Sequence, residues 1–439
     1  MEKKRTELNP PQILILVFLF FITLGTFLLM LPFSTTEGIT LGDALFTATS
    51  AMTVTGLAVV DTGTAFTLVG QWVILALIQL GGLGIMTFAV LIFMALGKKI
   101  GLKERMIIQQ SLNQTAVGGI ILLVKKLLIF SISMELVAIV LLSFRWVPEF
   151  GLSRGIYVST FHAISAFNNA GFSVWSDSLS GYVTDPVVNI VISFLFIIGG
   201  VGFTVVFDLW KTKDFHRLSL HTKTMLVGTI AINVFSILMI FVLEFNNPET
   251  IGNMSTPGKL MASYFQAVTP RTAGFNTIDI GAMEDDSLFF MLMLMFIGGG
   301  SASTAGGIKL TTAVIIIVAT LAFFRDKEDL TLFRRSLRPR LVMRALALTV
   351  GSVFLVFTST FFLNMTEDAS FLSILFEAIS AFGTVGLSTG ITGDLTIAGK
   401  MILVSLMLFG KLGPLTFAFA FTKPRPDPIK YPKEEVLTG

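Results

Sequence analysis

Long apolar segments constrain this sequence more than any other feature. A helix that crosses a membrane needs about 20 mostly apolar residues. Eight segments reach that length, at 12–31, 68–97, 118–144, 187–210, 224–243, 288–324, 341–363 and 396–421. Only 13% of the 439 residues are charged, whereas a soluble domain is about 25% charged. The sequence therefore predicts an all-α membrane protein with eight transmembrane helices.

Basic residues are distributed unevenly among the loops. Most of the 31 Lys and Arg residues lie near the N-terminus, in the loops after the second, fourth and sixth segments, and in the tail 423–439. Cytoplasmic loops of membrane proteins carry an excess of Lys and Arg. This rule accounts for the basic loops without a nucleic-acid partner. With eight spans, it places both termini in the cytoplasm.

Four shorter apolar segments lie between paired spans on the opposite side. They cover 41–53, 155–168, 258–270 and 369–383. Each is too short to cross a membrane, so each is predicted to be a re-entrant helix. Each is followed by a glycine, and these four glycines are spaced 103 to 115 residues apart: Gly56, Gly171, Gly274 and Gly386.

A second glycine motif follows each of these glycines, 24 to 28 residues later, inside the next span. These motifs begin at Gly81, Gly199, Gly298 and Gly410. They could have a role of their own or simply let helices pack closely. The pattern predicts one pore domain, 1–439, built from four span–re-entrant helix–span repeats around one axis. The repeats are 11–105, 115–215, 222–325 and 340–422, and 423–439 forms a cytoplasmic tail.

Four loops of the same orientation around one axis would offer a ring of backbone carbonyl groups. Such a ring can replace the hydration shell of a monovalent cation, and glycine permits the backbone angles that aim carbonyls inward. The predicted selectivity-filter residues are Thr53, Val54, Thr55, Gly56, Asn168, Asn169, Ala170, Gly171, Arg271, Thr272, Ala273, Gly274, Gly383, Thr384, Val385 and Gly386. Acids just outside would attract cations or form ordinary solvated loops: Asp61, Asp177, Asp279, Glu284, Asp285, Asp286 and Asp394.

The sixth span is interrupted by a stretch rich in Gly and Ser, which should unwind below the filter. It forms either a flexible internal gate or a passive kink. A lysine in the last span adds a charge that is costly at membrane depth. It would act as an electrostatic barrier or as a buried partner of Glu135 or Asp208. The predicted gate residues are Gly298, Gly299, Gly300, Ser301, Ala302, Ser303, Thr304, Ala305, Gly306, Gly307 and Lys411.

Several of these motifs resemble those of a known family. They lie at 163–172, 269–275 and 300–305, and the ending 431–439 is similar as well. On these residues the chain resembles the Trk/Ktr/HKT potassium transporters. The resemblance covers essentially the whole chain and is closest to the membrane subunits of bacterial Ktr systems, of the KtrB or KtrD type.

The resemblance implies potassium uptake across the bacterial plasma membrane, with K+ held by the filter carbonyls and Na+ often stimulating transport. It implies a homodimer in membrane lipid, in which each protomer has its own pore. It also implies a cytoplasmic ring of RCK regulatory subunits, of the KtrA or KtrC type, that bind ATP or ADP. The family's gating loop maps onto 298–309. That family usually carries Arg where this chain has Lys411.

The residues leave two transport modes open, a potassium-conducting pore and a sodium- or proton-coupled cation symporter that uses the same filter. An intramembrane enzyme would need a metal or nucleophile constellation, and the chain has three His and no Cys. No enzymatic activity and no structural metal are expected. The sequence also lacks a GxGxxG fingerprint, so no cofactor is expected in this chain.

Overall fold

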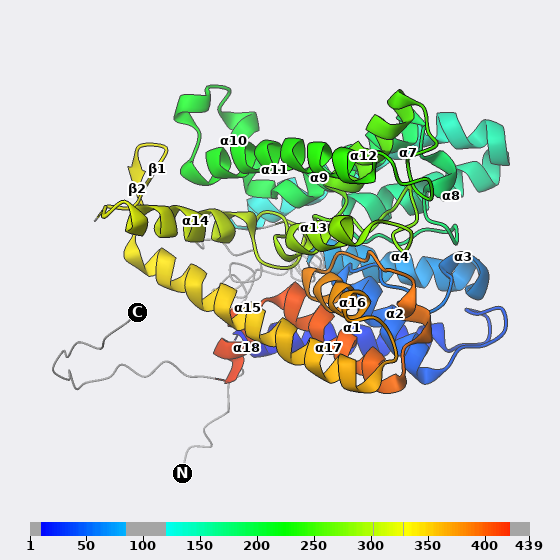
Figure 1. Ribbon diagram of the computed structural model, residues 1–439. Helices are drawn as coiled ribbons and strands as arrows, with labels where there is room; N and C mark the ends of the chain where they lie inside the picture. The colour runs from blue at the N-terminus through cyan, green and yellow to red at the C-terminus, as the bar shows by residue number, and fades with distance from the viewer. Residues whose placement is uncertain (1–9, 85–119, 302, 328, 422–439) are drawn as a thin grey trace, which may run out of the picture.

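The computed structural model describes residues 10–84, 120–301, 303–327 and 329–421 (Figure 1). Its α-helices are α1 (Pro10–Leu29), α2 (Leu41–Thr53), α3 (Thr62–Ala65), α4 (Leu68–Leu83), α7 (Ile120–Phe150), α8 (Leu152–Phe167), α9 (Pro186–Val201), α10 (Phe203–Lys211), α11 (Leu220–Glu244), α12 (Thr256–Val268), α13 (Asp285–Phe296), α14 (Leu310–Phe324), α15 (Pro339–Thr366), α16 (Phe371–Gly383), α17 (Ile397–Leu412) and α18 (Pro414–Phe421). Short 3-10 helices are η1 (Ser180–Tyr182), η2 (Phe215–Arg217) and η3 (Ile391–Asp394).

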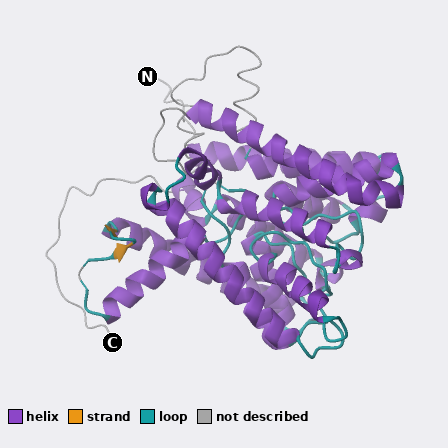
Figure 2. Cartoon of the chain, turned by 90° about the horizontal axis from the view of Figure 1, so that it is seen from above, coloured by secondary structure: helices purple, strands orange, loops and turns teal. Residues whose placement is uncertain are grey.

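One small antiparallel hairpin accompanies these helices within the described residues. Strand β1 (Thr331–Leu332) pairs with β2 (Arg335–Ser336), so that Thr331 lies opposite Ser336. Figure 2 shows extended loops enclosed between helices, and the hairpin lies outside that group. The chain is therefore essentially all-helical, as the apolar pattern predicts.

Four helices in the described part of the chain are long and apolar enough to cross a membrane by themselves: α1, α7, α11 and α15. A fifth crossing results if α9 and α10, bent by 92°, count as one span. The other expected spans are not single long helices. In the segment 288–324, α13 and α14 are separated by residues 297–309. In 396–421, α17 and α18 meet at Gly413, and 68–97 is described only to residue 84.

Glycine ends three of these helices. Gly84, Gly202 and Gly413 follow α4, α9 and α17, with φ angles of 83°, 106° and 83°. Side chains disfavour this left-handed region, and glycine enters it freely. The sequence singled out only the sixth span as broken. The structure adds breaks at Gly202 and Gly413, because a single glycine is enough to turn the chain.

The four predicted re-entrant helices form as α2, α8, α12 and α16, each 13 or 16 residues long. Local capping starts two of them, since Thr40 accepts from the Asp43 backbone N–H and Ser370 accepts from the Ser373 N–H. Such side-chain caps satisfy backbone donors that have no partner inside the helix. All four helices end directly before the glycine loops.

The second glycine motifs allow close contact between the backbones of two helices. A Cβ atom at Gly81 would lie 1.9 Å from the Met52 carbonyl oxygen, and one at Gly410 would lie 1.9 Å from that of Phe382. A Cβ at Gly199 would lie 2.1 Å from the Phe167 oxygen. In these three cases the motif therefore packs α4, α9 or α17 against the end of α2, α8 or α16, as the close-packing interpretation requires.

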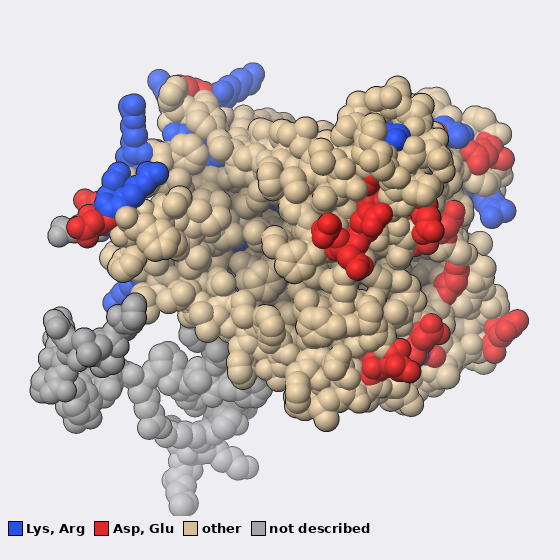
Figure 3. Space-filling view, viewed as in Figure 1, with Lys and Arg blue, Asp and Glu red and all other residues tan. Residues whose placement is uncertain are grey.

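Charge separates along the long axis of the molecule. Figure 3 shows Lys and Arg gathered at the end where α10 and the hairpin lie, and Asp and Glu mostly at the opposite end. Much of the surface between these ends is uncharged in this view. This distribution is typical of a protein whose middle lies in a membrane.

Replacing Gly81 by Ala tests the helix contact. We expect a loss of about 1–3 kcal/mol of stability, because the new methyl group collides with backbone that cannot rotate away. Thermal unfolding of the detergent-purified protein measures the loss. Gly351→Ala is the matched control in α15, since a Cβ there meets nothing within 4 Å. Equal melting temperatures for both variants would contradict the contact.

Candidate functional site

The four glycine loops share one backbone conformation. In each loop, a non-glycine residue with positive φ is followed two positions later by a glycine with positive φ. The non-glycine residues are Val54 (51°), Asn169 (57°), Thr272 (70°) and Thr384 (49°). The glycines are Gly56 (94°), Gly171 (68°), Gly274 (78°) and Gly386 (92°). Since left-handed backbone is uncommon outside glycine, its recurrence at equivalent positions marks a shared geometry.

The four loops meet in a ring, in chain order. A Cβ atom built on any of these four glycines would touch a backbone carbonyl oxygen of another loop. That carbonyl belongs to the residue directly before the other loop's own glycine. These distances are 2.4 Å from Gly56 to Ala170, 3.1 Å from Gly171 to Ala273, 2.4 Å from Gly274 to Val385 and 2.2 Å from Gly386 to Thr55. The four loops therefore close into a ring of backbone contacts, in which a carbonyl group of one loop lies against the glycine of another and no side chain could fit.

Hydroxyl groups at the ends of the re-entrant helices hold the loops. Ser50 Oγ accepts from the Gly56 N–H at 3.1 Å, and Ser380 Oγ accepts from the Gly386 N–H at the same distance. Ser165 Oγ donates to the carbonyl of Phe172 at 2.8 Å. In the third repeat, Thr269 Oγ1 donates to the Phe275 carbonyl at 2.5 Å. A hydroxyl group near the end of each helix thus positions the loop that follows it.

His162 and Glu377, which follow Phe161 and Phe376 in α8 and α16, bond the segments that come after the loop glycines. His162 Nε2 is hydrogen-bonded to Ser173 Oγ at 3.0 Å. Glu377 accepts from the Ser388 hydroxyl and, at 3.0 Å, from Thr392 Oγ1. Through these hydrogen bonds, each side chain ties its own helix to the segment after the loop glycine.

A buried polar cluster supports the second loop, and sequence reasoning missed it. Asn168 Nδ2 donates to Gln79 Oε1 at 2.8 Å and to Glu135 Oε1 at 3.3 Å. Gln79 Nε2 in turn donates to Glu135 Oε1 at 3.0 Å. Asn168 directly follows α8, and Gln79 and Glu135 come from α4 and α7. The available signal was the presence of Gln79 and Glu135 in otherwise apolar spans, where polar groups need partners.

The third loop differs from the others in carrying Arg271. Its side chain is buried and turns towards α11, where Nη1 donates to Asn233 Oδ1 at 3.1 Å and Nη2 to Thr229 Oγ1 at 3.4 Å. The guanidinium is therefore hydrogen-bonded to side chains of α11. Arg271 can serve the ring only through its backbone.

The loop that breaks the sixth span lies against the ring and the second glycine motifs. Its backbone N–H groups donate to glycine carbonyls: Gly300 to Gly200 at 2.7 Å, Thr304 to Gly199 at 3.2 Å and Gly307 to Gly410 at 3.3 Å. One side chain reaches the second filter loop directly, because Thr304 Oγ1 donates to Asn169 Oδ1 at 2.7 Å. Of the predicted gate residues, Ala302 lies outside the described residues.

Two lysines clamp this loop. Lys411 Nζ donates to the Thr304 carbonyl at 2.6 Å, and Lys309 Nζ donates to the Ala305 carbonyl at 2.6 Å. The suggested pairing of Lys411 with Glu135 or Asp208 is wrong. Glu135 belongs to the cluster around Asn168, and Asp208 accepts from the hydroxyl of Thr222 at 2.5 Å. A buried ammonium group here satisfies carbonyls that the broken helix leaves without partners.

Several of the predicted outer acids have local structural roles. Asp61 caps α3 by accepting from the Thr64 N–H at 2.9 Å, and Asp279 accepts from the Gly281 N–H at 2.9 Å. Asp285 and Asp286 are exposed in the first turn of α13. The acids thus combine local capping with a negative surface at the end towards which the filter loops lead.

Comparison with known proteins decides the family. A family model named TrkH and described as a cation transport protein matches residues 4–430. This chain belongs to the TrkH family of cation transport proteins. It is a family of transporters and not of enzymes.

Curated relatives and a solved structure agree with that assignment. The chain is 57% identical to Ktr system potassium uptake protein B of Bacillus subtilis (strain 168), covering 99% of this chain and 98% of that protein. It is 43% identical to the protein of the same name from Vibrio alginolyticus, covering 100% and 97%. The crystal structure of the potassium transporter TrkH from Vibrio parahaemolyticus superposes with a TM-score of 0.73 at 23% identity, covering 96% of this chain and 87% of that one. The latter match concerns the fold.

Replacing Thr304 by Val tests the tie between the broken helix and the ring. Valine keeps the shape but removes the donor to Asn169, and an unsatisfied buried oxygen costs about 1–3 kcal/mol. We expect amide hydrogen exchange in 299–307 to rise roughly tenfold, the change that 1.4 kcal/mol produces.

Thr320→Val is the matched control, because Thr320 Oγ1 bonds only within its own helix, to Ile316 O. Unchanged exchange in a folded Thr304→Val protein would show that this hydrogen bond does not hold the loop.

Proposed function

We propose that this chain is the ion-translocating subunit of a Ktr-type potassium uptake system in the bacterial plasma membrane. One observation carries the proposal: four loops of identical backbone conformation bring four equivalent carbonyl groups together, at Thr55, Ala170, Ala273 and Val385. Two curated relatives named Ktr system potassium uptake protein B support the choice of ion.

The filter would work through its backbone. Potassium is the transported ion, and it would exchange its hydration shell for carbonyl oxygens of the predicted filter residues. The re-entrant helices α2, α8, α12 and α16 end at these loops, so the negative ends of their dipoles face the same point. Such an arrangement favours a cation without placing a formal charge in its path.

The proposed membrane topology has eight crossings in four repeats around one pore, with both termini in the cytoplasm. The interrupted pairs α9–α10, α13–α14 and α17–α18 would each complete one crossing. The basic end of the molecule would face the cytoplasm and the acidic end the outside (Figure 3). Irregular backbone at membrane depth is acceptable here because it is enclosed by protein.

The interrupted sixth span would be the gate. Residues 298–301 and 303–307 lie next to the ring, and Lys309 and Lys411 bond the carbonyls of Ala305 and Thr304. Opening requires that the bonds from Thr304 to Asn169 and from Gly300 to Gly200 break or rearrange. Lysine offers fewer fixed hydrogen-bond donors than the Arg that is usual in the family. Lys411 would therefore hold fewer backbone carbonyl groups of this loop than an Arg would.

The subunit would act within a larger assembly. We infer a homodimer and a cytoplasmic ring of RCK subunits, of the KtrA or KtrC type, that binds ATP or ADP. The word "system" in the names of the two relatives supports a second component. The basic end of the molecule offers a surface for the RCK ring. Na+ would stimulate transport.

Potassium uptake in cells that lack their own potassium transporters tests the function. Expression of this chain with an RCK partner should restore growth at low potassium, and the chain alone should give weaker, unregulated uptake. No uptake from a correctly inserted protein would refute the proposal. The alternative, a sodium- or proton-coupled symporter, requires that potassium flux stop without the coupling ion at fixed membrane potential.

Replacing Gly171 by Ser tests the filter. A Cβ there would lie 2.8 Å from the Cα of Gly274, and the φ of 68° is itself unfavourable for serine. We expect the loop to shift, so that potassium/sodium discrimination in uptake falls about tenfold or more, since a ring distortion worth 1.4 kcal/mol changes relative affinity tenfold.

Gly390→Ser is the matched control. Gly390 has a φ of 101° but meets nothing within 4 Å, so that variant carries the backbone strain without a contact to the ring. Unchanged discrimination in folded Gly171→Ser, or an equal loss in Gly390→Ser, would contradict the filter assignment.

A further inference from the structure

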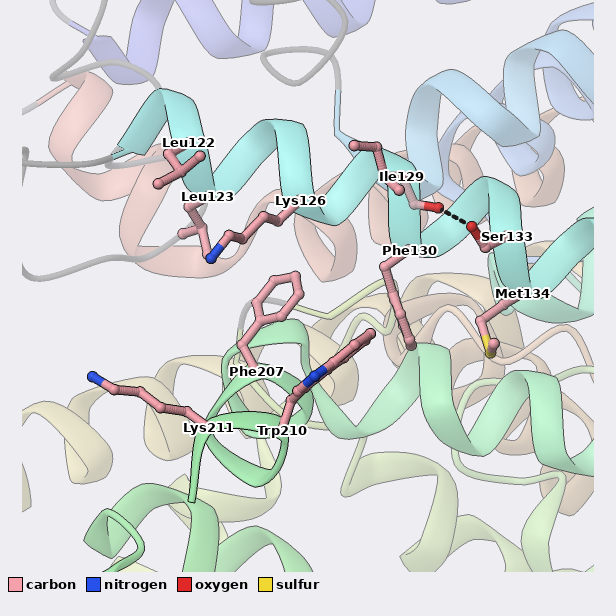
Figure 4. A pocket seen from close by; sticks show the side chains of 10 residues that line it. All are labelled: Leu122, Leu123, Lys126, Ile129, Phe130, Ser133, Met134, Phe207, Trp210 and Lys211. Atoms are coloured by element: carbon pink, nitrogen blue, oxygen red, sulfur yellow. Dashed lines mark hydrogen bonds between the residues drawn. The ribbon is translucent and has the colours of Figure 1, made fainter. Parts of the chain in front are cut away.

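A groove between α7 and α10 takes no part in the ion path described above (Figure 4). Its volume is about 700 Å³, within the 300–1,000 Å³ typical of small-molecule sites. The lining residues are Leu122, Leu123, Lys126, Ile129, Phe130, Ser133, Met134, Phe207, Trp210 and Lys211. Eight of these ten side chains are uncharged, and most of them are apolar.

The two ends of the groove differ in chemistry. Figure 4 shows the ammonium groups of Lys126 and Lys211 at one end, from opposite walls, and Phe130 and Met134 towards the other end. The hydroxyl of Ser133 is already bonded to the Ile129 carbonyl at 2.6 Å. The groove therefore presents an apolar slot with a positively charged mouth.

The two lysines at the mouth, Lys126 and Lys211, are held in no ion pair by the described part of the chain. The carboxylate of Asp208, one turn before Lys211, accepts from the Ser219 N–H and the Thr222 hydroxyl at the start of α11. Two ammonium groups at one end of an apolar groove suit a phosphate ester.

The groove also opens on a surface that is apolar and exposed. The side chain of Trp210 is 75% exposed, and those of Leu122 and Ile129 are each 57% exposed. Tryptophan concentrates where a membrane meets water, because its ring is apolar and its N–H is polar. Under the topology proposed above, the lysine mouth lies at the cytoplasmic leaflet, whose anionic lipids attract basic residues.

We propose that this groove is a binding site for one anionic phospholipid of the cytoplasmic leaflet. Its phosphate lies between Lys126 and Lys211, and one acyl chain lies along Phe130, Phe207 and Trp210. The proposal uses the membrane orientation given under the proposed function. Charge complementarity at one end and an apolar slot at the other select a lipid over a soluble anion, which would use only the mouth.

A lipid in this position would contact a chain of aromatic rings that leads to the second filter loop. Phe130 lies edge-on to Phe207, with ring centroids 6.3 Å apart, and to Phe167 at 6.4 Å. Phe167 is the last residue of α8, directly before the filter residue Asn168. Because α10 follows the break at Gly202, a lipid between α7 and α10 also holds that half-helix in place.

Trp210 supplies the probe for a direct test. The protein is reconstituted into phosphatidylcholine vesicles with a small, fixed fraction of acyl-brominated phosphatidylglycerol, or with acyl-brominated phosphatidylcholine instead. Bromine quenches tryptophan fluorescence on contact, and subtraction of the signal of Trp210→Phe isolates this residue among the four tryptophans. We expect stronger quenching by the anionic lipid.

The variant Lys126→Gln/Lys211→Gln should lower the preference for anionic lipid about tenfold, since each basic residue near an anionic surface contributes a several-fold preference. The matched control is Lys125→Gln/Lys213→Gln, which removes equal charge from adjacent positions outside the groove. It should keep the preference.

Three results would overturn the site: equal quenching by both lipids, an equal loss of preference in both double variants, or no quenching by either lipid because protein covers the groove. The assay needs no transport. Lipid preference in a protein that takes up no potassium would refute only the proposed function, and uptake without lipid preference would refute only the lipid site.

Discussion

Backbone contact among four glycines is the constraint on which the rest of this structure depends. A side chain on Gly56 or Gly274 would meet a carbonyl oxygen of another loop at 2.4 Å. Loops can approach this closely only if each arrives with the same left-handed turn, and each turn requires a helix that stops directly before it. The short re-entrant helices and the glycines of the second motifs serve that requirement. A side chain at position 81 or 410 would collide with the end of α2 or of α16.

Polar groups then hold the loops from several sides. Hydroxyl groups at the helix ends bond the glycine N–H group in two loops and a Phe carbonyl in the other two, while Glu377 and His162 tie the outer segments back to their own helices. On the other side, Thr304 joins the broken sixth span to Asn169. These bonds lie among apolar residues, where an unmade hydrogen bond is costly. The ring is thus coupled to the broken helix through a few specific contacts rather than through general packing.

Sequence patterns predict the elements well and their partners poorly. The bounds of α2 follow from an apolar segment, a capping Thr40 and a following glycine, all of which are local. The break at Gly202 was not predicted, because an isolated glycine inside an apolar segment is compatible with a continuous helix. The partner of Lys411 was also not predicted. A buried charge suggests an acid, but the broken helix offers a free carbonyl at Thr304, and only the folded chain brings the two together.

The sequence by itself predicted a membrane protein built from long apolar helices, and it placed a glycine at the equivalent position after each of four shorter apolar segments. Those properties depend on hydrophobicity and spacing, which act along the chain. The tertiary structure decided that the loops close into a ring, that Arg271 turns away to α11 and that Glu135 supports Asn168. It also decided that α7 and α10 leave a groove with two lysines at its mouth. These features join residues from distant segments, and their distances depend on how the helices pack.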